Sequence, residues 1–213
     1  MRSLKYILLA GLTLAVVIWF TAGEAEAAQT LSKEIAPDVS AETLEAFVSH
    51  ADVYLTGSGD KEVLLVADPF CPYSRKTYNL LLRRLEYIRM VRVLLVCRFP
   101  ETGSDVAAAF VMRMHAAGKG GSALETALKL EIPHEGGRDT ARQRVLELLK
   151  EVFPHELKED HFEALRPEIR RVAKNTDLAH GVGYTGTPHI VVGRRVLHGY
   201  TRRGIDILLK QDH

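Results

Sequence analysis

The chain has 213 residues, of which 46% are hydrophobic and 26% charged, and this length and composition suit one well-buried domain better than two. Its formal net charge of +1 at pH 7 argues against a general nucleic-acid binder, because such proteins concentrate basic side chains on one face. The composition gives no indication of a long disordered region.

Residues 1–27 are typical of an export signal. Arg2 and Lys5 precede an apolar stretch over 6–22, and Ala25-Glu26-Ala27 has the small-x-small pattern of a cleavage site. Because the apolar stretch is near the minimum length that spans a bilayer, an uncleaved N-terminal membrane anchor is the alternative to a cleaved signal peptide. In both cases we expect the rest of the chain to lie outside the cytoplasm, in the periplasm or another extracytoplasmic space.

Residues 28–59 are expected to form a short extension ahead of the main domain. Ser40 is a suitable N-cap for a helix, because the apolar positions after it recur at helical spacing. A strand is expected over 52–56, and the glycine-rich stretch 57–60 is typical of a turn. We therefore expect this strand to form a hairpin with the apolar run that follows, over 62–67.

That apolar run ends at Asp68-Pro69, and Cys71 and Pro72 then precede a segment with helical periodicity. Proline suits the first helical position, where its missing N–H costs no hydrogen bond. A cysteine at a helix N-terminus meets unpaired N–H groups and the positive end of the helix dipole, which favour the reactive thiolate form. Ser74 stands where a redox Cys-x-x-Cys motif has its second cysteine, so the attacking thiol is present without the usual resolving thiol.

The helix that begins at Pro72 is expected to run to about Arg89, followed by a buried strand over 91–97. A strand, a helix and a second strand in this order predict a right-handed parallel crossover. The crossover places Cys71 and Cys97 at the same edge of the sheet. A pair of cysteines in an exported protein is often a structural disulfide, but here one cysteine precedes a helix and the other ends a strand.

Residues 101–180 are expected to form a block of helices. Ser122 and Glu125 have the spacing of a capping box that begins one of these helices, and Asp139 is a suitable cap for the next. Pro167 is expected to start or kink the last helix of the block, because proline disrupts a helix interior.

The C-terminal part returns to strand chemistry after Gly186-Thr187-Pro188. Two short apolar runs over 189–200 are separated by Gly193-Arg194, a pattern that predicts a β-hairpin. Thr201 is a suitable cap for a final helix. The predicted order is therefore βαβ, a block of helices and then ββα, within a main domain over 60–213.

Two stretches of the sequence resemble one family. The run Ala67-Asp68-Pro69-Phe70-Cys71-Pro72-Tyr73 resembles the active-site strand of the periplasmic disulfide isomerases of the DsbC/DsbG type, and Gly186-Thr187-Pro188 with Gly199-Tyr200 resembles their C-terminal signature. The resemblance covers about residues 60–100 and 170–210. It implies a thioredoxin fold, an α/β fold with a mixed central sheet, that carries a helical insertion between the two stretches.

The same resemblance implies the roles of the site residues. Cys71 is then the nucleophile of a Cys-Pro-Tyr-Ser motif that continues through Pro72, Tyr73 and Ser74. Thr187-Pro188 is then a cis peptide bond packed against the cysteine, with the Thr187 backbone open to an extended substrate segment. The chain departs from the family at Ser74, because a hydroxyl cannot attack a mixed disulfide. The family's N-terminal dimerisation domain also has no counterpart here, since the residues between signal and main domain are too few.

These features predict an exported thiol–disulfide exchange protein, similar to an isomerase or a reductase, that acts through a single nucleophilic cysteine. Cys71 is expected to attack a substrate disulfide, a sulfenic acid or a glutathionylated cysteine and to form a mixed disulfide. The expected partners are cysteine-containing exported proteins and a thiol reductant, either glutathione or a membrane or periplasmic protein, with no cofactor and no nucleic acid. Two alternatives stay open: a redox-inactive chaperone or assembly module, and a serine placed at position 74 deliberately to trap complexes.

Three further residues are candidates for accessory roles. Cys97 is either the resolving thiol or a buried strand cysteine that acts as a small hydrophobe. His189 either lies close to Cys71, where a protonated imidazole favours the thiolate, or points away. Asp68 either caps the turn or transfers a proton. The cysteines and histidines lack the spacing of a metal site, so no metal is expected.

Overall fold

The computed structural model describes residues 35–36, 39–130, 136–157 and 161–210. The chain divides into two compact units, Met1–Ala36 and Pro37–His213. The first unit contributes one described element, the two-residue strand β1 (Ile35–Ala36), and the expected export signal lies outside the described residues. Within the described ranges, no helix combines the length and the apolar character that a membrane span requires.

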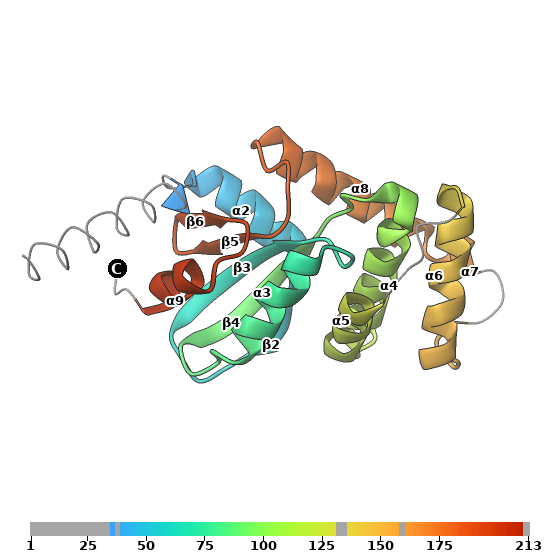
Figure 1. Cartoon of the computed structure of the whole chain (residues 1–213), viewed down its shortest axis with the longest axis horizontal. Helices are drawn as coiled ribbons and strands as arrows, with labels where there is room; N and C mark the ends of the chain where they lie inside the picture. Colours follow the sequence, from blue (N-terminus) through green and yellow to red (C-terminus); the bar gives the residue numbers. More distant parts are fainter. Residues whose placement is uncertain (1–34, 37–38, 131–135, 158–160, 211–213) are drawn as a thin grey trace, which may run out of the picture. The chain divides into compact units, whose positions relative to one another are not determined.

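A mixed sheet forms the centre of the second unit (Figure 1). Its strands are β2 (Asp52–Thr56), β3 (Lys61–Ala67), β4 (Ile88–Leu95), β5 (His189–Val192) and β6 (Arg195–His198). Within this unit the strand order is β6-β5-β3-β4-β2; β3 and β4 are parallel, and the other neighbouring pairs are antiparallel. Residues 63–67 of β3 are all buried, which explains why this central strand is an unbroken apolar run.

Helices cover both faces of this sheet. They are α2 (Ala41–His50), α3 (Pro72–Leu82), α8 (Arg166–Gly181) and α9 (Arg202–Lys210). Figure 1 shows α3 and α9 in front of the strands and α2 behind them. Arg84 and Asp206 form an ion pair that joins the end of α3 to α9, whereas His50 and Asn175 form a hydrogen bond between α2 and α8. The predicted order of βαβ, helices and ββα is confirmed.

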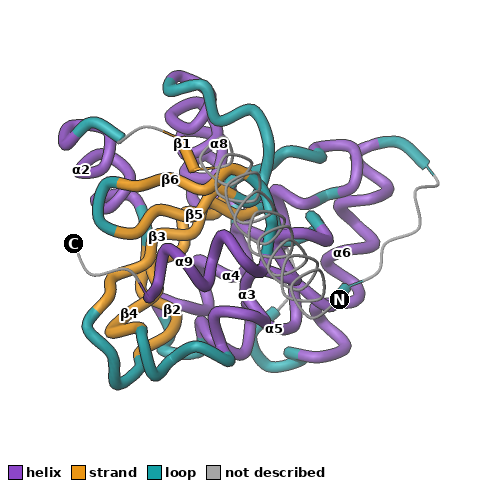
Figure 2. Tube along the Cα trace, turned by 60° about the vertical axis from the view of Figure 1, so that its left-hand side comes forward, coloured by secondary structure: helices purple, strands orange, loops and turns teal. Residues whose placement is uncertain are grey.

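A block of helices follows β4 and lies to the right of the sheet in Figure 1. It consists of a 3-10 turn (Pro100–Thr102), α4 (Ser104–Ala116), α5 (Gly120–Lys129), α6 (Arg138–Val152) and α7 (His161–Ala164), and α8 leads back to the sheet. The turned view of Figure 2 also shows the strands (orange) on one side and α6 on the other. Residues 106–112 of α4 are all buried, so this helix is the core of the block. The predicted helical insertion is confirmed.

The predicted hairpin between β2 and β3 is wrong. β2 pairs with β4, so β4 lies between β2 and β3. The loop after β2 crosses the start of β4, where the Gly57 N–H donates a hydrogen bond to the Arg89 carbonyl oxygen at 3.1 Å. A Cβ atom at Gly57 or Gly59 would overlap the backbone of residues 85–88. The glycines that suggested a hairpin turn therefore permit a close backbone crossing.

The end of the α3 segment also differs from the prediction. α3 ends at Leu82 instead of continuing to about Arg89. β4 begins at Ile88, ahead of the predicted start at residue 91, because Ile88 pairs with Lys61 of β3. Ile88, the last apolar residue of the predicted helical pattern, thus belongs to β4. Apolar periodicity alone does not distinguish these two states at an element boundary.

The predicted helix caps are partly confirmed. Ser40 accepts a hydrogen bond from the Thr43 N–H at 3.1 Å, and Thr201 accepts one from the Gly204 N–H at 3.1 Å, so both residues are N-caps. The start of α8 at Arg166, with Pro167 in its first turn, also agrees with the prediction.

Two other helix starts are corrected. α5 has Lys119 as its N-cap, and the Ser122 hydroxyl lies inside the helix and donates to the Lys119 carbonyl oxygen at 3.0 Å, so no capping box forms. α6 begins after Gly137, which places Asp139 in the first turn. A carboxylate in the first turn still stabilises a helix, because it interacts with the positive end of the helix dipole. Asp139 therefore does mark the start of α6, although it is not the cap.

Candidate functional site

Cys71 is the N-cap residue of α3, and Pro72 lies in the first turn of this helix. The turn after β3 holds it there, because the Cys71 N–H donates to the Asp68 carbonyl oxygen at 3.1 Å. The side chain is only 4% exposed. Since the first N–H groups of a helix have no partner within it, the thiol stands at the positive end of the α3 dipole.

The loop that carries Thr187 and Pro188 faces this thiol. The peptide bond between these two residues is cis. Cys71 Sγ donates a hydrogen bond to the Thr187 carbonyl oxygen at 3.2 Å. On the other side of the loop, the Gly199 N–H donates to the Pro188 carbonyl oxygen at 2.8 Å, which ties the loop to the end of β6. The fold thus brings together the two stretches that carry the sequence resemblance.

The two remaining side chains of the motif differ in exposure. Ser74 is fully buried, and its hydroxyl has no hydrogen-bond partner among the described residues. Tyr73 is 53% exposed, and the Lys76 ammonium group lies 5.2 Å from the centroid of its ring, in cation–π contact. The site therefore has a buried hydroxyl within α3 and an aromatic ring at its solvent edge.

Asp68 lies beneath the site and connects three elements. One carboxylate oxygen, Oδ1, accepts from the Phe70 N–H at 2.7 Å; the other, Oδ2, accepts from the Arg98 N–H at 2.5 Å and from the Ser104 hydroxyl at 3.0 Å. These bonds join the ends of β3 and β4 to the start of α4. Complete burial raises the pKa of Asp68, and the hydrogen bonds oppose this rise. The geometry favours the capping role among the two that the sequence left open.

Cys97 is an unbridged thiol, as is Cys71. Its Sγ lies 3.2 Å from the Ser104 hydroxyl oxygen, and its N–H donates to the Thr176 hydroxyl at 2.9 Å. Burial raises the pKa of the Cys97 thiol to about 11. Since the thiolate is the attacking species, this environment disfavours a resolving role for Cys97. No local sequence pattern points to Ser104, whose hydroxyl lies between Cys97 and Asp68 because of tertiary packing.

His189 belongs to a cluster of three rings. Its Nδ1 lies 2.6 Å from Nδ1 of His198, and its ring stacks on Tyr184 at a centroid distance of 4.1 Å. Burial, reinforced by the neighbouring His198, lowers the pKa of His189 to about 4. Of the two alternatives for His189, the one with a protonated imidazole beside the thiol is disfavoured, because the lowered pKa leaves this ring neutral at pH 7. The register of the β5–β6 hairpin, which places His189 opposite His198, would have revealed the pair from the sequence.

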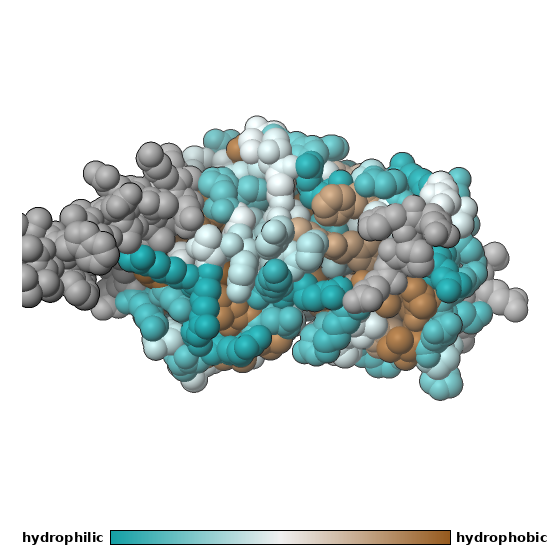
Figure 3. All heavy atoms as spheres, in the orientation of Figure 1, coloured by the Kyte–Doolittle hydropathy of each residue, from teal (hydrophilic) through white to brown (hydrophobic). Residues whose placement is uncertain are grey.

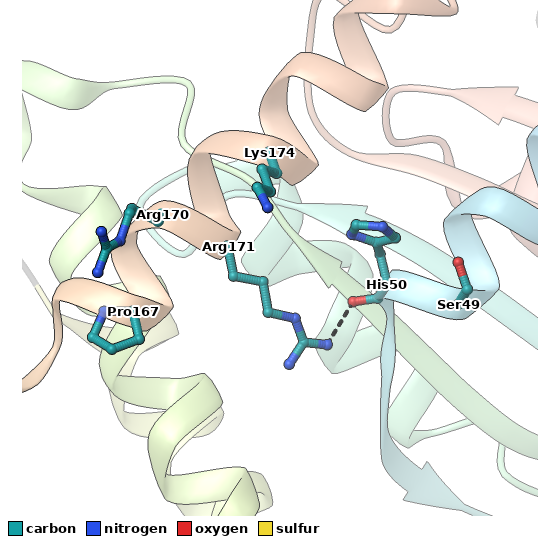
Figure 4. A pocket seen from close by; sticks show the side chains of 6 residues that line it. All are labelled: Ser49, His50, Pro167, Arg170, Arg171 and Lys174. Carbon is teal, nitrogen blue, oxygen red and sulfur yellow. Dashed lines mark hydrogen bonds between the residues drawn. The ribbon is translucent and has the colours of Figure 1, made fainter.

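A separate open hollow lies on the other side of the sheet, between α2 and α8 (Figure 4). Its volume is about 560 Å³, and its lining side chains are Ser49, His50, Pro167, Arg170, Arg171 and Lys174. Figure 4 shows Arg171 reaching from α8 to the end of α2, where it donates to the His50 carbonyl oxygen at 2.8 Å. No group of three or more metal-ligating side chains exists within the part of the chain that the structure describes.

Several solved structures resemble this chain, although no protein-family model and no curated protein matches it. A thioredoxin-like oxidoreductase from Silicibacter pomeroyi DSS-3 has a TM-score of 0.57 and 20% identity, over 82% of this chain and 100% of its own. A periplasmic thioredoxin-like protein from Salmonella enterica serovar Typhimurium has a TM-score of 0.60 and 15% identity, over 82% and 97%. Proteus mirabilis ScsC in a compact conformation has a TM-score of 0.57 and 17% identity, over 99% and 96%. The likeness establishes the fold: the chain has a thioredoxin-like α/β fold, and the predicted fold class is confirmed.

Proposed function

We propose that this chain is an exported thiol–disulfide exchange protein, similar to an isomerase or a reductase, that acts through Cys71 alone. The observation that supports this most directly is the position of its thiol, at the start of α3 and hydrogen-bonded to the Thr187 carbonyl oxygen. A helix N-terminus stabilises a thiolate, and a backbone carbonyl oxygen beside it can pair with an extended peptide. Ser74 supplies no second thiol, so the chemistry rests on one sulfur.

The proposed step is a thiol–disulfide exchange, in which one S–S bond forms as another breaks and no external oxidant or reductant is needed. The Cys71 thiolate attacks one sulfur of a client disulfide, a new S–S bond forms to Cys71, and the client's second sulfur leaves as a thiolate that takes up a proton. A second client thiolate can later expel Cys71 and form a different client disulfide. Isomerisation of this kind needs no resolving cysteine, whereas release as a reduced client needs an external thiol, either glutathione or a membrane or periplasmic reductant.

The carbonyl oxygen of Thr187 is proposed to hold the client. In the free protein it accepts a hydrogen bond from the Cys71 thiol. Once Cys71 is part of a mixed disulfide it has no proton to donate, so the carbonyl oxygen is free to accept an N–H from the client backbone. Substrate contact and chemistry are thereby coupled at one backbone atom. The clients expected are exported proteins that contain cysteine.

Export is supported by two independent features. Residues 1–27 have the charge, apolar stretch and small-residue pattern of a signal segment. The Salmonella structure that resembles this chain is described as periplasmic, and another similar structure, from Wolbachia pipientis, as a thiol–disulfide exchange protein. An oxidising compartment is where clients with disulfides occur.

Client capture tests the proposal. The full-length protein, incubated with a secreted protein whose disulfides have been scrambled, should form disulfide-linked complexes that persist on non-reducing gels and that mass spectrometry assigns to Cys71. The Cys71→Ala variant should form none and should fail to accelerate recovery of the native disulfides. Recovery at the original rate with Cys71→Ala would overturn the proposal.

The alternative function is a redox-inactive chaperone or assembly module. One observation favours it: Cys71 is 4% exposed, and its thiol proton is engaged with Thr187. Alkylation of Cys71 across a range of pH separates the two functions. Labelling at pH 6 that is much faster than that of a cysteine in an unfolded peptide supports exchange chemistry; labelling no faster at any pH supports the binding module.

A further inference from the structure

A narrow cationic groove runs along α3 beside the Cys71 site. It has a volume of about 190 Å³. Lys76 and Asn79 of α3, with Arg83 just after the end of this helix, form one wall, while Tyr200 and Arg202 form the other. Positions 76, 79 and 83 share one face of the helix, because residues three, four and seven apart lie above one another.

One residue on each side links the groove to the surroundings of the Cys71 site. On the α3 side, Lys76 contacts the exposed ring of Tyr73, with the ammonium nitrogen 5.2 Å from the ring centroid. On the other side, Tyr200 follows Gly199, whose N–H donates to the Pro188 carbonyl oxygen at 2.8 Å. The groove therefore lies next to the elements where the proposed function puts a client segment.

The cations of the groove are not neutralised from within. Among the described residues, Lys76, Arg83 and Arg202 form no ion pair; the Arg83 Nε–H donates to the Asn79 carbonyl oxygen at 3.1 Å. Arg84 also lines the groove, but it is paired with Asp206, the one carboxylate on α9, to which it donates hydrogen bonds of 2.7 and 3.3 Å.

The surroundings add positive charge. A second hollow, on α9, shares Arg202 with the groove and is lined also by Arg203, Lys210, Ile207 and the carboxylate Asp206, so three cations face one anion there. Glu86 is an exposed acidic residue close to Arg84. Figure 3 shows strongly hydrophilic side chains over α9 and α3 in this view. Arg84 and Arg171 form ion pairs within the protein, whereas Arg83 and Arg202 have none among the described residues and can bind a carboxylate from outside.

We propose that this groove binds carboxylate side chains of the client segment whose cysteine becomes joined to Cys71. The inference rests on the proposed function and names the class of client: polypeptides with acidic residues near the reactive cysteine. Arginine suits this role, because its planar guanidinium binds a carboxylate through two parallel hydrogen bonds.

The distance from Cys71 to the far end of the groove sets the spacing of those acidic residues. Arg83 is twelve positions beyond Cys71, which corresponds to about 18 Å along a helix axis at about 1.5 Å per residue. An extended peptide rises about 3.3 Å per residue, so about five or six residues span that distance. Glutathione is too short to reach Arg83 from Cys71, so the far end of the groove distinguishes a polypeptide from a small thiol.

The test compares matched peptides, each with one cysteine held as a mixed disulfide with a coloured thiol whose release is followed by absorbance. There are two glutamate peptides, which carry glutamates about four to six residues from the cysteine, one on the N-terminal side and the other on the C-terminal side. Each has a counterpart in which glutamines replace the glutamates. At low salt, one glutamate version should react with Cys71 about threefold to tenfold faster than its glutamine counterpart. Raised salt should reduce this advantage.

Variants of the full-length protein assign the effect to the groove. Arg83→Gln with Arg202→Gln should remove the preference for glutamate, while Arg170→Gln with Lys174→Gln should keep it. The second pair removes the same charge from the hollow on the other side of the sheet (Figure 4). Both double substitutions lie at exposed positions, so both proteins should fold.

Three results would overturn the inference. The first is equal rates for glutamate and glutamine peptides on the unsubstituted protein. The second is an equal loss of preference in both double variants, which indicates net charge alone. The third is a loss of rate with glutathione disulfide, in the Arg83→Gln, Arg202→Gln protein, that equals the loss with the glutamate peptide. That result assigns the groove to small anionic thiols. Failure of Cys71 to react with any of the disulfides contradicts the proposed function itself, a different outcome from equal rates.

Discussion

The Cys71 thiol and the Thr187 carbonyl oxygen, 116 positions apart in the chain, are joined by a hydrogen bond of 3.2 Å. The bond connects the start of α3 with the loop that precedes β5. It places the sulfur against a backbone acceptor instead of a charged side chain. The chemistry proposed for Cys71 thus depends on the helix N-terminus and on the backbone of the loop, and four measurements probe the residues that support this arrangement.

Ser74 should determine how long a mixed disulfide survives. Ser74→Cys restores a resolving thiol, so complexes with clients should fall about tenfold or more in abundance on non-reducing gels, because an internal thiolate expels the client. Ser74→Ala should leave the complexes in place. It should also keep or slightly raise the free energy of unfolding, by up to about 1 kcal/mol, since it removes a buried hydroxyl without a partner. Complexes of equal abundance in Ser74→Cys would contradict the explanation.

Cys97 should be unreactive in the native protein. Because burial raises its pKa to about 11, only about a thousandth of Cys97 is thiolate at pH 8. Mass spectrometry after brief alkylation should show Cys97 unmodified, and labelling should become complete in denaturant. Cys97→Ser should form client complexes at the same rate as the unsubstituted protein. Slower release of clients from Cys97→Ser would instead identify Cys97 as the resolving thiol.

Asp68 should influence stability through both its acceptors and its titration. In Asp68→Asn an NH2 group replaces one acceptor oxygen, so at least one of the three donors around it loses its bond, at a cost of about 1–3 kcal/mol at pH 7. Because the folded-state pKa of Asp68 is raised, the folded protein binds this proton more tightly than the unfolded chain, and the contribution of Asp68 falls as pH rises above 3.8. Urea unfolding at several pH values should show that this decline is absent from Asp68→Asn. An identical pH dependence in both proteins would contradict it.

His189 should make the protein less stable as pH falls, which is opposite to the effect of Asp68. Its pKa falls from 6.5 to about 4 on folding, so the unfolded chain binds the proton more tightly, and stability is lost as pH falls from 6.5 to 4. The loss attributable to His189 is about 3 kcal/mol at pH 4. His189→Gln should remove most of this acid sensitivity, while substitution of the exposed His155 by Gln should not. Equal acid sensitivity in His189→Gln and the unsubstituted protein would be the contrary result.

Comparison of each variant with the unsubstituted protein is needed for the last two measurements, because Asp68 and His189 titrate over overlapping ranges with opposite signs. The unsubstituted protein shows only their sum. The differences isolate each residue, provided that the unfolding transitions remain two-state over the range used.

Local signals determined much of the fold. The unbroken apolar run of β3, the proline after Cys71 and the turn at Gly193-Arg194 each act over a few residues, so the sequence alone predicted a thiol at a helix start and the β5–β6 hairpin. Ser74 in place of a second cysteine is likewise a matter of sequence.

Longer-range contacts decided the rest. β2 pairs with β4 because the Gly57–Gly59 crossing lets the two backbones touch, and no periodicity within β2 specifies which strand it joins. Ser104 reaches Asp68 from 36 positions away, and the walls of the cationic groove come from α3 and from the chain after β6. Local geometry depends on neighbours in sequence, whereas pairing, burial and the shifts in pKa depend on which distant segments exclude water from one another. The Cys-Pro-Tyr-Ser stretch therefore identified the candidate reacting atom, and only the tertiary structure supplied the carbonyl oxygen, the buried carboxylate and the groove near it.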